Sequence, residues 1–419
     1  MKKVTLLSLA ATTVLMASGY KIPEQSQKSV ALSAANVAHA YGADAAYENP
    51  ANMAFETGNG AFEMSLAYIH LTDTKFEGTV TSLGTPDPSG ATSKKENFLI
   101  PTFYYVSPAV DDFHFGLAFV SPVGLTKRWD EQPAKGLAEE FSLMTYEVNP
   151  TVAYKVNDQF AIAAGLRMIY ADGTVKSSAP ATSLFATRNM EGDTLEFGYN
   201  LAVTYKATSE LELAATYRSE IDLDVEGHAT LSNIAFGPYT AGSYSGPVSV
   251  SVPAPATLNL AAAYTFDQTT TVEAVFERTY WSAYKNLDFE YNGDKSNFSP
   301  FLTTVFDDSR DKNWKDVNSY RLGLTHKYDA DLTLMAGMVF FDTPMPEATL
   351  GFEHPDSKGW AYSAGFRHKL SDEYEVGASF LYADRENRTV NNTNVGTEID
   401  GTFSNTAVYY LSLGIEYKF

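Results

Sequence analysis

The sequence predicts an all-β fold: a fourteen-stranded antiparallel transmembrane β-barrel whose lumen is plugged by an N-terminal segment. Three observations predict it. Segments of alternating apolar and polar residues recur about fourteen times within residues 58–419. The connections between them alternate between short polar turns and long polar loops. Aromatic residues are abundant, with 26 tyrosines and 26 phenylalanines, and many stand at the ends of apolar faces, as the interfacial girdles of membrane barrels require.

The first element, residues 1–19, has the pattern of a secretory signal peptide that is removed. Two lysines precede a short apolar stretch over residues 4–16, and Ala17 and Gly19 place small side chains where a cut before Tyr20 needs them. A cut one or two residues earlier also fits. The alternative is a buried helix.

The second element, residues 20–57, is rich in Ala, Ser and Asn and shows no sustained alternation. A barrel of fourteen strands has a lumen wide enough to need filling, so we expect this segment to plug it as a hatch. The alternative is a disordered periplasmic tail. Within it, Asn49, Pro50 and Ala51 predict a structural turn packed against the barrel wall, because proline fixes φ and asparagine bonds the backbone of a turn.

The third element, residues 58–419, is the barrel itself. Its clearest strand is the last, in which every second residue from Tyr409 to Phe419 is apolar and most of the others are polar or small. In a strand these two sets point to opposite faces. Strands of this kind begin near residues 60, 96, 112, 141, 159, 193, 210, 255, 270, 317, 331, 359, 373 and 406.

The connections indicate which end of the barrel lies outside. Six short turns face the periplasm and seven long loops face outward. A closed barrel satisfies every backbone group in a bilayer, which an open sheet cannot do; a soluble β-sandwich or propeller is the alternative. The turns lie at 111–112, 157–158, 208–209, 267–268, 329–330 and 371–372, and the loops at 72–95, 126–140, 172–192, 222–249, 286–316, 343–358 and 386–405.

Two of these loops, 172–192 and 222–249, carry apolar side chains. Exposed apolar clusters often mark binding surfaces, so we expect a groove here that first captures a hydrophobic ligand. Packing of the loops against each other is the alternative. The residues are Leu184, Phe185, Leu231, Ile234 and Phe236.

Composition and missing motifs exclude several functions. A formal charge of −21 makes the chain a poor binder of nucleic acid, because phosphate contacts need clustered Lys and Arg. The absence of cysteine rules out thiolate metal sites and cysteine nucleophiles. The seven histidines are scattered, and neither H-E-x-x-H nor G-x-S-x-G occurs. We therefore expect no enzyme, no metal site and no cofactor.

Several short motifs, in one order along the chain, resemble a known family. The set is similar to the outer-membrane transporters of long-chain fatty acids and hydrocarbons of the FadL/TodX type, and it spans the mature chain. The motifs are Gly19-Tyr20-Lys21-Ile22-Pro23-Glu24-Gln25-Ser26, Glu48-Asn49-Pro50-Ala51, Trp281-Ser282-Ala283-Tyr284, Trp314-Lys315-Asp316, Tyr320-Arg321, Asp342-Thr343-Pro344-Met345-Pro346 and Pro355-Asp356.

This resemblance implies a monomer in the outer membrane of a Gram-negative bacterium, in contact with its lipid and lipopolysaccharide. Hydrophobic compounds, foremost long-chain fatty acids, would enter from outside, bind in apolar pockets, and leave passively through a lateral wall opening after hatch movement. A channel of the same fold for aromatic hydrocarbons or alkanes is the alternative, and a general porin is a weaker one. An adhesin or phage-receptor role stays open beside transport.

The resemblance also suggests site residues. A fatty acid needs a dry pocket for its tail and a cation or hydrogen-bond donors for its carboxylate. Lys315 and Lys176 stand at extracellular ends of strands and resemble the family's basic pocket positions, the match at Lys176 being off by about one residue; solvated loop lysines are the alternative. Tyr20 is expected to line the pocket, unless it belongs to a flexible terminus.

An interruption is expected in the third strand, where Pro122 and Gly124 follow an alternating run. Proline cannot donate to a ladder, and glycine weakens a strand. The resemblance implies that this kink forms a lateral gate in the wall. The alternative is an ordinary end of the strand.

Overall fold

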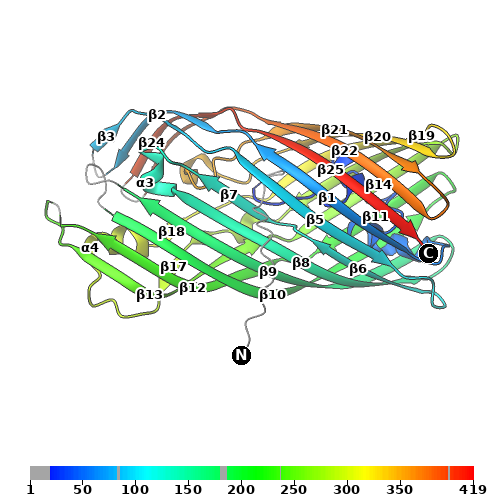
Figure 1. Cartoon of the computed structure of the whole chain (residues 1–419), viewed down its shortest axis with the longest axis horizontal. Coiled ribbons are helices and arrows are strands. Elements are labelled where there is room, and N and C mark those ends of the chain that lie inside the picture. Colours follow the sequence, from blue (N-terminus) through cyan, green and yellow to red (C-terminus); the bar gives the residue numbers. More distant parts are fainter. Residues whose placement is uncertain (1–18, 83–84, 180–185, 236, 395–396) are drawn as a thin grey trace.

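The computed structural model describes residues 19–82, 85–179, 186–235, 237–394 and 397–419. The chain forms a closed fourteen-stranded antiparallel β-barrel (Figure 1), which confirms the predicted fold. The ring closes where β1 pairs with both β5 and β25. The wall consists of β1 (Ala61–Leu71), β5 (Glu96–Val106), β6 (Phe113–Val120) with β7 (Gly124–Arg128), β8 (Glu140–Lys155), β9 (Phe160–Ser178), β10 (Ala186–Lys206), β11 (Leu211–Arg218) with β12 (Ile221–Asn233), β13 (Gly242–Ala254) with β14 (Thr257–Phe266), β15 (Thr270–Thr279) with β17 (Phe289–Tyr291), β19 (Val317–Lys327), β20 (Leu332–Phe341), β21 (Gly359–Lys369), β22 (Tyr374–Arg385) and β25 (Ala407–Lys418).

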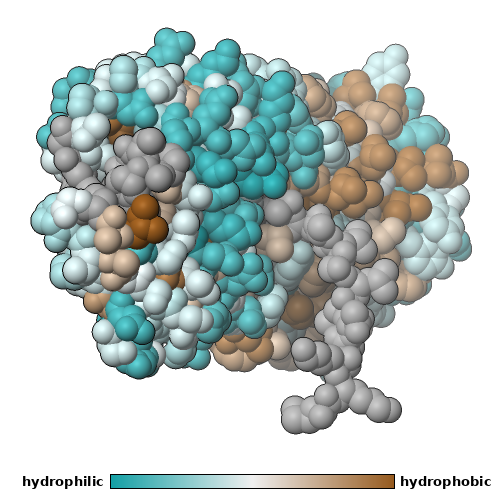
Figure 2. All heavy atoms as spheres, turned by 60° about the vertical axis from the view of Figure 1, so that its left-hand side comes forward, coloured by the Kyte–Doolittle hydropathy of each residue, from teal (hydrophilic) through white to brown (hydrophobic). Residues whose placement is uncertain are grey.

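The strands present apolar side chains on the outside and small or polar ones inside. In β1, Leu66 and Tyr68 are exposed, whereas Glu63, Ser65 and Ala67 are buried. Figure 2 shows apolar residues gathered over the barrel wall and hydrophilic ones over the capped end. An outward apolar band over an inward polar face is the arrangement that a barrel in a bilayer requires. Among the described residues, no helix is both long and apolar enough to span a membrane.

The alternation of short turns and long connections is confirmed. The six short turns join strands at one end of the barrel, and the long connections form a cap at the other (Figure 1). Part of this cap is a separate sheet in which β2 pairs with β24, β3 and β4, and β24 with β23. The cap contains β2 (Lys75–Ser82), β3 (Thr85–Asp87), β4 (Ala91–Thr92), α3 (Ala134–Ala138), η2 (Trp281–Ala283), β16 (Asn286–Leu287), α4 (Pro300–Leu302), η3 (Thr303–Asp307), β18 (Arg310–Asp311), η4 (Glu347–Thr349), β23 (Arg388–Asn394) and β24 (Thr397–Ser404).

Two predicted loops are instead extensions of strands. Much of 172–192 belongs to β9 and β10, and much of 222–249 belongs to β12 and β13. In β12 the alternation has the opposite sense from that in the membrane: Leu223 and Val225 are buried, and the aspartates beside them are exposed. These strands continue beyond the bilayer, so their outer face meets water and their inner face is the apolar one.

The hatch segment, residues 20–57, lies inside the barrel (Figure 1). Its helix α1 (Gln27–Ala31) packs against β20, β21, β22 and β25, and η1 (Pro50–Phe55) packs against β6, β8, β9 and β10. The short helix α2 (Ala45–Glu48) packs against β5, β6 and β8. Contacts with walls on opposite sides of the ring place the segment across the lumen.

The hatch approaches the wall so closely at β20 that only glycine fits there. A Cβ atom on Gly337 would lie 2.2 Å from the carbonyl carbon of Leu32 and 2.6 Å from the amide nitrogen of Ser33. We expect Gly337→Ala to push this part of the hatch from the wall and to lower the free energy of unfolding by about 1–3 kcal/mol. Limited proteolysis within residues 20–57 and denaturant unfolding measure both effects. Gly58→Ala, whose Cβ meets nothing closer than 4.0 Å, is the control; equal behaviour of the two variants would contradict the prediction.

Candidate ligand-binding cavity and wall opening

An apolar cavity of about 100 Å³ lies at the capped end of the barrel, between the strand extensions and the cap. The alternation of β13 turns Val248, Val250 and Val252 toward it, and that of β8 turns Phe141 and Leu143. Such a lining suits a hydrocarbon, because transfer of each CH2 group from water contributes about 0.8 kcal/mol. The other lining residues are Tyr20, Leu125, Ser142, Gly173, Val175, Met190, Glu191, Gly192, Val225, Gly227, Tyr284, Leu287, Phe289, Lys312, Trp314, Met345, Glu353 and His354.

Tyr20 brings the hatch into the cavity wall. Its hydroxyl donates to the carbonyl of Pro253 at 2.7 Å, and the residue is 3% exposed. Its ring lies 4.6 Å from that of Trp281 and 5.6 Å from that of Trp314, centroid to centroid. The predicted pocket residue therefore lies in a buried aromatic cluster.

A second cavity adjoins the first and contains cations. The two share Phe141, Leu287, Phe289, Lys312 and Glu353 as lining residues. Lys312 is buried and forms an ion pair with Glu353. Burial alone would raise the pKa of Glu353, but the charge and hydrogen bond of Lys312, a backbone hydrogen bond and the charge of Arg310 together lower it. Lys312 and Glu353 thus form one ion pair in the wall shared by the two cavities.

Arg188, on β10, also lines this second cavity, and its positive charge is less well compensated than that of Lys312. Its guanidinium carbon lies 5.4, 5.3 and 5.0 Å from the ring centroids of Phe141, Phe289 and Phe306. One nitrogen donates to Ser177 Oγ at 2.9 Å, whereas Nε has no hydrogen-bond partner among the described residues. Burial of a cation without a carboxylate is costly, so this position is suited to receive an anionic group.

The two predicted lysines lie elsewhere. Lys315 is exposed and does not line the cavity, although its amide donates to the carbonyl of Pro344. Lys176 pairs with Glu140 at 3.0 Å and points away from the cavity, because its neighbour Val175 occupies the inward face of β9. Among the described residues, the cations that line the two cavities are Lys312, Arg188 and Arg310, none of which was predicted.

The predicted capture groove is only partly described. Leu184, Phe185 and Phe236 lie outside the described residues. Leu231 is fully buried on the inner face of β12, not exposed in a loop, and Ile234 is 54% exposed beyond the end of that strand. Leu231 therefore belongs to the core of the cap.

The wall is interrupted where Pro122 and Gly124 occur. Strand β6 ends at Val120 and β7 begins at Gly124. The ladder between β5 and β6 has only four residue pairs, 103–106 with 116–119, whereas β1 pairs with β5 over eleven residues. No ladder pair is formed between β5 and β7 in the described part of the chain. The remainder of β5 therefore borders a gap in the hydrogen-bonded wall.

The first residues of the hatch pair with the interrupted part of the wall in the manner of a short antiparallel strand. The amide of Ile22 donates to the carbonyl of Pro122, and that of Gly124 donates to the carbonyl of Tyr20, both at 2.8 Å. Between these bonds Lys21 pairs with Val123 as an isolated antiparallel bridge. One short segment thus contacts both the cavity, through Tyr20, and the gap.

Buried ion pairs fix the hatch to the rest of the barrel. Arg321 on β19 contacts Glu24 of the hatch at 3.3 Å and Glu277 of β15 at 3.2 Å, and Lys21 pairs with the same Glu277. Arg321, Glu24 and Glu277 are each at most 5% exposed. Removing one partner of a buried ion pair strongly destabilises a folded protein, so these pairs hold the segment in place.

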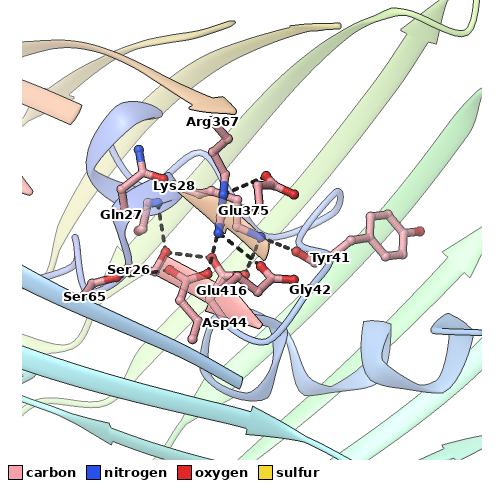
Figure 3. Close-up of polar contacts among 12 residues, drawn as sticks. Ser26, Gln27, Lys28, Tyr41, Gly42, Asp44, Ser65, Arg367, Glu375 and Glu416 are labelled. Carbon is pink, nitrogen blue, oxygen red and sulfur yellow. Dashed lines mark hydrogen bonds and ion pairs between the residues drawn. The ribbon is translucent and has the colours of Figure 1, made fainter. Parts of the chain in front are cut away.

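A second cluster of ion pairs (Figure 3) lies nearer the short turns, since its Glu375 is the second residue of β22, shortly after the turn at 371–372. Arg367 on β21 lies 2.8 Å from Glu63, 2.8 Å from Glu375 and 3.1 Å from Glu416. Beside it, Lys28 of the hatch pairs with Asp44 at 2.6 Å (Figure 3). Strands from three parts of the sequence and the hatch meet at this cluster.

The turn at Asn49, Pro50 and Ala51 lies buried against the wall. Asn49 Oδ1 accepts from the amide of Ala51, and Nδ2 donates to Thr204 Oγ1 of β10 at 2.8 Å. Pro50 begins η1, where no amide donor is needed. The three residues carry packing contacts.

The sequence is similar to known outer-membrane proteins. The profile of the outer membrane protein transport protein family (OMPP1/FadL/TodX) matches residues 8–419. The long-chain fatty acid transport protein of Escherichia coli K12 is 24% identical over 389 residues, 80% of this chain and 84% of that protein. Outer membrane protein P1 of Haemophilus influenzae is 22% identical over 426 residues, 90% and 89% of the two chains.

Solved structures share the fold. A Pseudomonas aeruginosa FadL homologue superposes with a TM-score of 0.83 at 20% identity and covers 96% of this chain and 100% of its own. The Pseudomonas putida toluene transporter TodX gives a TM-score of 0.69 at 19% identity, with 97% and 99% covered. At these identities the likeness establishes the barrel architecture.

Proposed function

Because the chain belongs to the outer membrane transport protein family of FadL and TodX, we propose that it takes up long-chain fatty acids. Its family and its barrel make it a transporter of hydrophobic compounds in the Gram-negative outer membrane. The proposal concerns the cargo, the residues that bind it and the route that it follows.

The observation that carries the proposal is an apolar cavity that shares lining residues with a second one, in which Nε of Arg188 has no hydrogen-bond partner among the described residues. The apolar lining of the first cavity suits part of an alkyl tail. The second suits a carboxylate, because charge-assisted hydrogen bonds to a guanidinium are strong and directional. Lys312 stands at the boundary, since it lines both cavities. A cargo without a charged head would leave Arg188 uncompensated.

The proposed route runs from the cap to the gap beside β6 and β7. Tyr20 lines the cavity, and the residues that follow it bond to the interrupted strand. Displacement of this short segment would join the cavity to the gap, from which an apolar molecule passes sideways into the bilayer. Binding and release need only diffusion, so transport is passive.

The test measures how tightly octadecanoic acid and toluene, a neutral hydrocarbon, bind to the detergent-purified protein. We expect Arg188→Met and Lys312→Met to weaken octadecanoic acid binding by about 10- to 100-fold, since a hydrogen bond to a charged group contributes about 1.5–3 kcal/mol, and to leave toluene unaffected. Lys176→Met and Lys315→Met are matched controls, because neither residue lines either cavity. Toluene binding without fatty acid binding would reassign the cargo to hydrocarbons.

A further inference from the structure

The cavity wall contains hydrogen-bonding groups that a plain alkyl tail does not satisfy. Trp314 and His354 both line the cavity and are 4% and 3% exposed. Neither Trp314 Nε1 nor the two ring nitrogens of His354 has a hydrogen-bond partner among the described residues. The two rings are neighbours in the cavity wall, 5.7 Å apart from centroid to centroid.

The chemistry of these atoms specifies the group that would satisfy them. An indole N–H only donates. Burial, together with the positive charges of Arg385 and Lys127, lowers the pKa of His354 well below its usual range, so its ring is neutral and carries one donor and one acceptor nitrogen. A methylene satisfies none of these atoms, and a carboxylate leaves the acceptor unmatched. A hydroxyl both donates and accepts, and therefore matches the set.

We propose that the cavity recognises a hydroxyl group on the alkyl chain through Trp314 and His354, so that hydroxylated long-chain fatty acids bind in preference to unsubstituted ones. This rests on the proposed function, because Arg188 and Lys312 would hold the carboxylate. Lys312 is two residues from Trp314, and Glu353 adjoins His354, so the two polar subsites are neighbours in the chain. The two subsites differ in charge: Arg188 and Lys312 take the anionic head, and Trp314 and His354 take a neutral oxygen.

The test compares octadecanoic acid with a set of its positional hydroxy isomers in binding to the full-length protein in detergent. We expect at least one isomer to bind about five- to tenfold more tightly than octadecanoic acid, the gain of roughly one net hydrogen bond. Trp314→Phe and His354→Leu should each reduce this preference, the ratio of the two affinities measured in the same variant, to less than about twofold. Either variant suffices if the other fails to fold.

Trp129→Phe is the matched control, because Trp129 is equally buried but its Nε1 already donates to the carbonyl of Phe352 at 2.8 Å. It should keep the preference. The proposal is overturned if no isomer binds more tightly than octadecanoic acid, as a retained water on these nitrogens would cause, or if the preference persists in both variants. Failure of octadecanoic acid and every isomer to bind would overturn the proposed function itself.

Discussion

A disulfide between Lys21→Cys and Val123→Cys is expected to abolish uptake. The two residues form a non-hydrogen-bonded antiparallel pair, flanked by the bonds of Ile22 to Pro122 and of Gly124 to Tyr20. Cα atoms in such a pair lie about 4.5 Å apart, within the range that a disulfide spans. The cross-link would fix the hatch to the interrupted strand, and cargo in the cavity would not reach the gap.

The measurement is uptake of labelled octadecanoic acid by cells without another outer-membrane fatty acid transporter, before and after reduction. The native chain has no cysteine, so the engineered pair is the only one that can bond. Reduction should restore uptake to the level of the Lys21→Cys single variant, which controls for loss of the Glu277 pair. Full uptake by the oxidised protein would exclude movement of this segment.

A second cross-link tests how much of the hatch must move during uptake. Ser33 Oγ and Ser363 Oγ of β21 lie 2.8 Å apart and are buried, so Cys at both positions introduces little change in volume. We expect this disulfide to leave uptake nearly intact, because the proposed route requires displacement of the first hatch residues alone. Loss of uptake in both oxidised pairs would instead indicate motion of the whole hatch.

The barrel was predictable because its signal is repetitive. Each membrane strand repeats an outward apolar and inward small or polar face, as Leu66 and Ser65 illustrate, and short turns fix where strands begin. The same rule failed above the membrane. In β12, apolar and polar residues such as Leu223 and Asp222 alternate with equal regularity, but here water replaces lipid outside the barrel, so the apolar face turns inward. The polar sequence of this segment therefore led to its prediction as a loop.

The site was predictable only where local chemistry is distinctive. Pro122 and Gly124 mark the interruption because their backbones limit strand pairing, and Tyr20 is the aromatic residue next to the predicted cut. Arg188 lies in a segment that was expected to be a loop, so no inward face was assigned to it. Lys312 and Lys315 lie in one irregular segment. Without a repeating alternation of side chains, the sequence does not indicate which of the two lysines points to the cavity.

The other large effect is expected at the cluster near the short turns (Figure 3), where Arg367 faces Glu63, Glu375 and Glu416. Arg367 and Glu416 are each 3% exposed in their side chains, and Glu63 is fully buried. Arg367→Met removes the central cation and leaves three carboxylates facing one another, with Lys418 at 3.4 Å from Glu375 and 3.7 Å from Glu416 as a remaining, more exposed cation. Loss of one partner from a buried ion pair costs about 3–5 kcal/mol, and we expect a loss of this size in unfolding free energy.

Denaturant unfolding of the protein in detergent measures this loss, and two further variants identify its cause. Lys369→Met, two residues along the same strand, removes a lysine whose partner Asp372 is 98% exposed, and it should unfold like wild type. Adding Glu63→Gln and Glu416→Gln to Arg367→Met should recover part of the loss, because neutral amides do not repel one another. For the same reason the loss from Arg367→Met alone should shrink as the pH falls and the carboxylates take up protons. If the triple variant is no more stable than Arg367→Met, the cost arises from lost packing, since electrostatic repulsion would have been relieved.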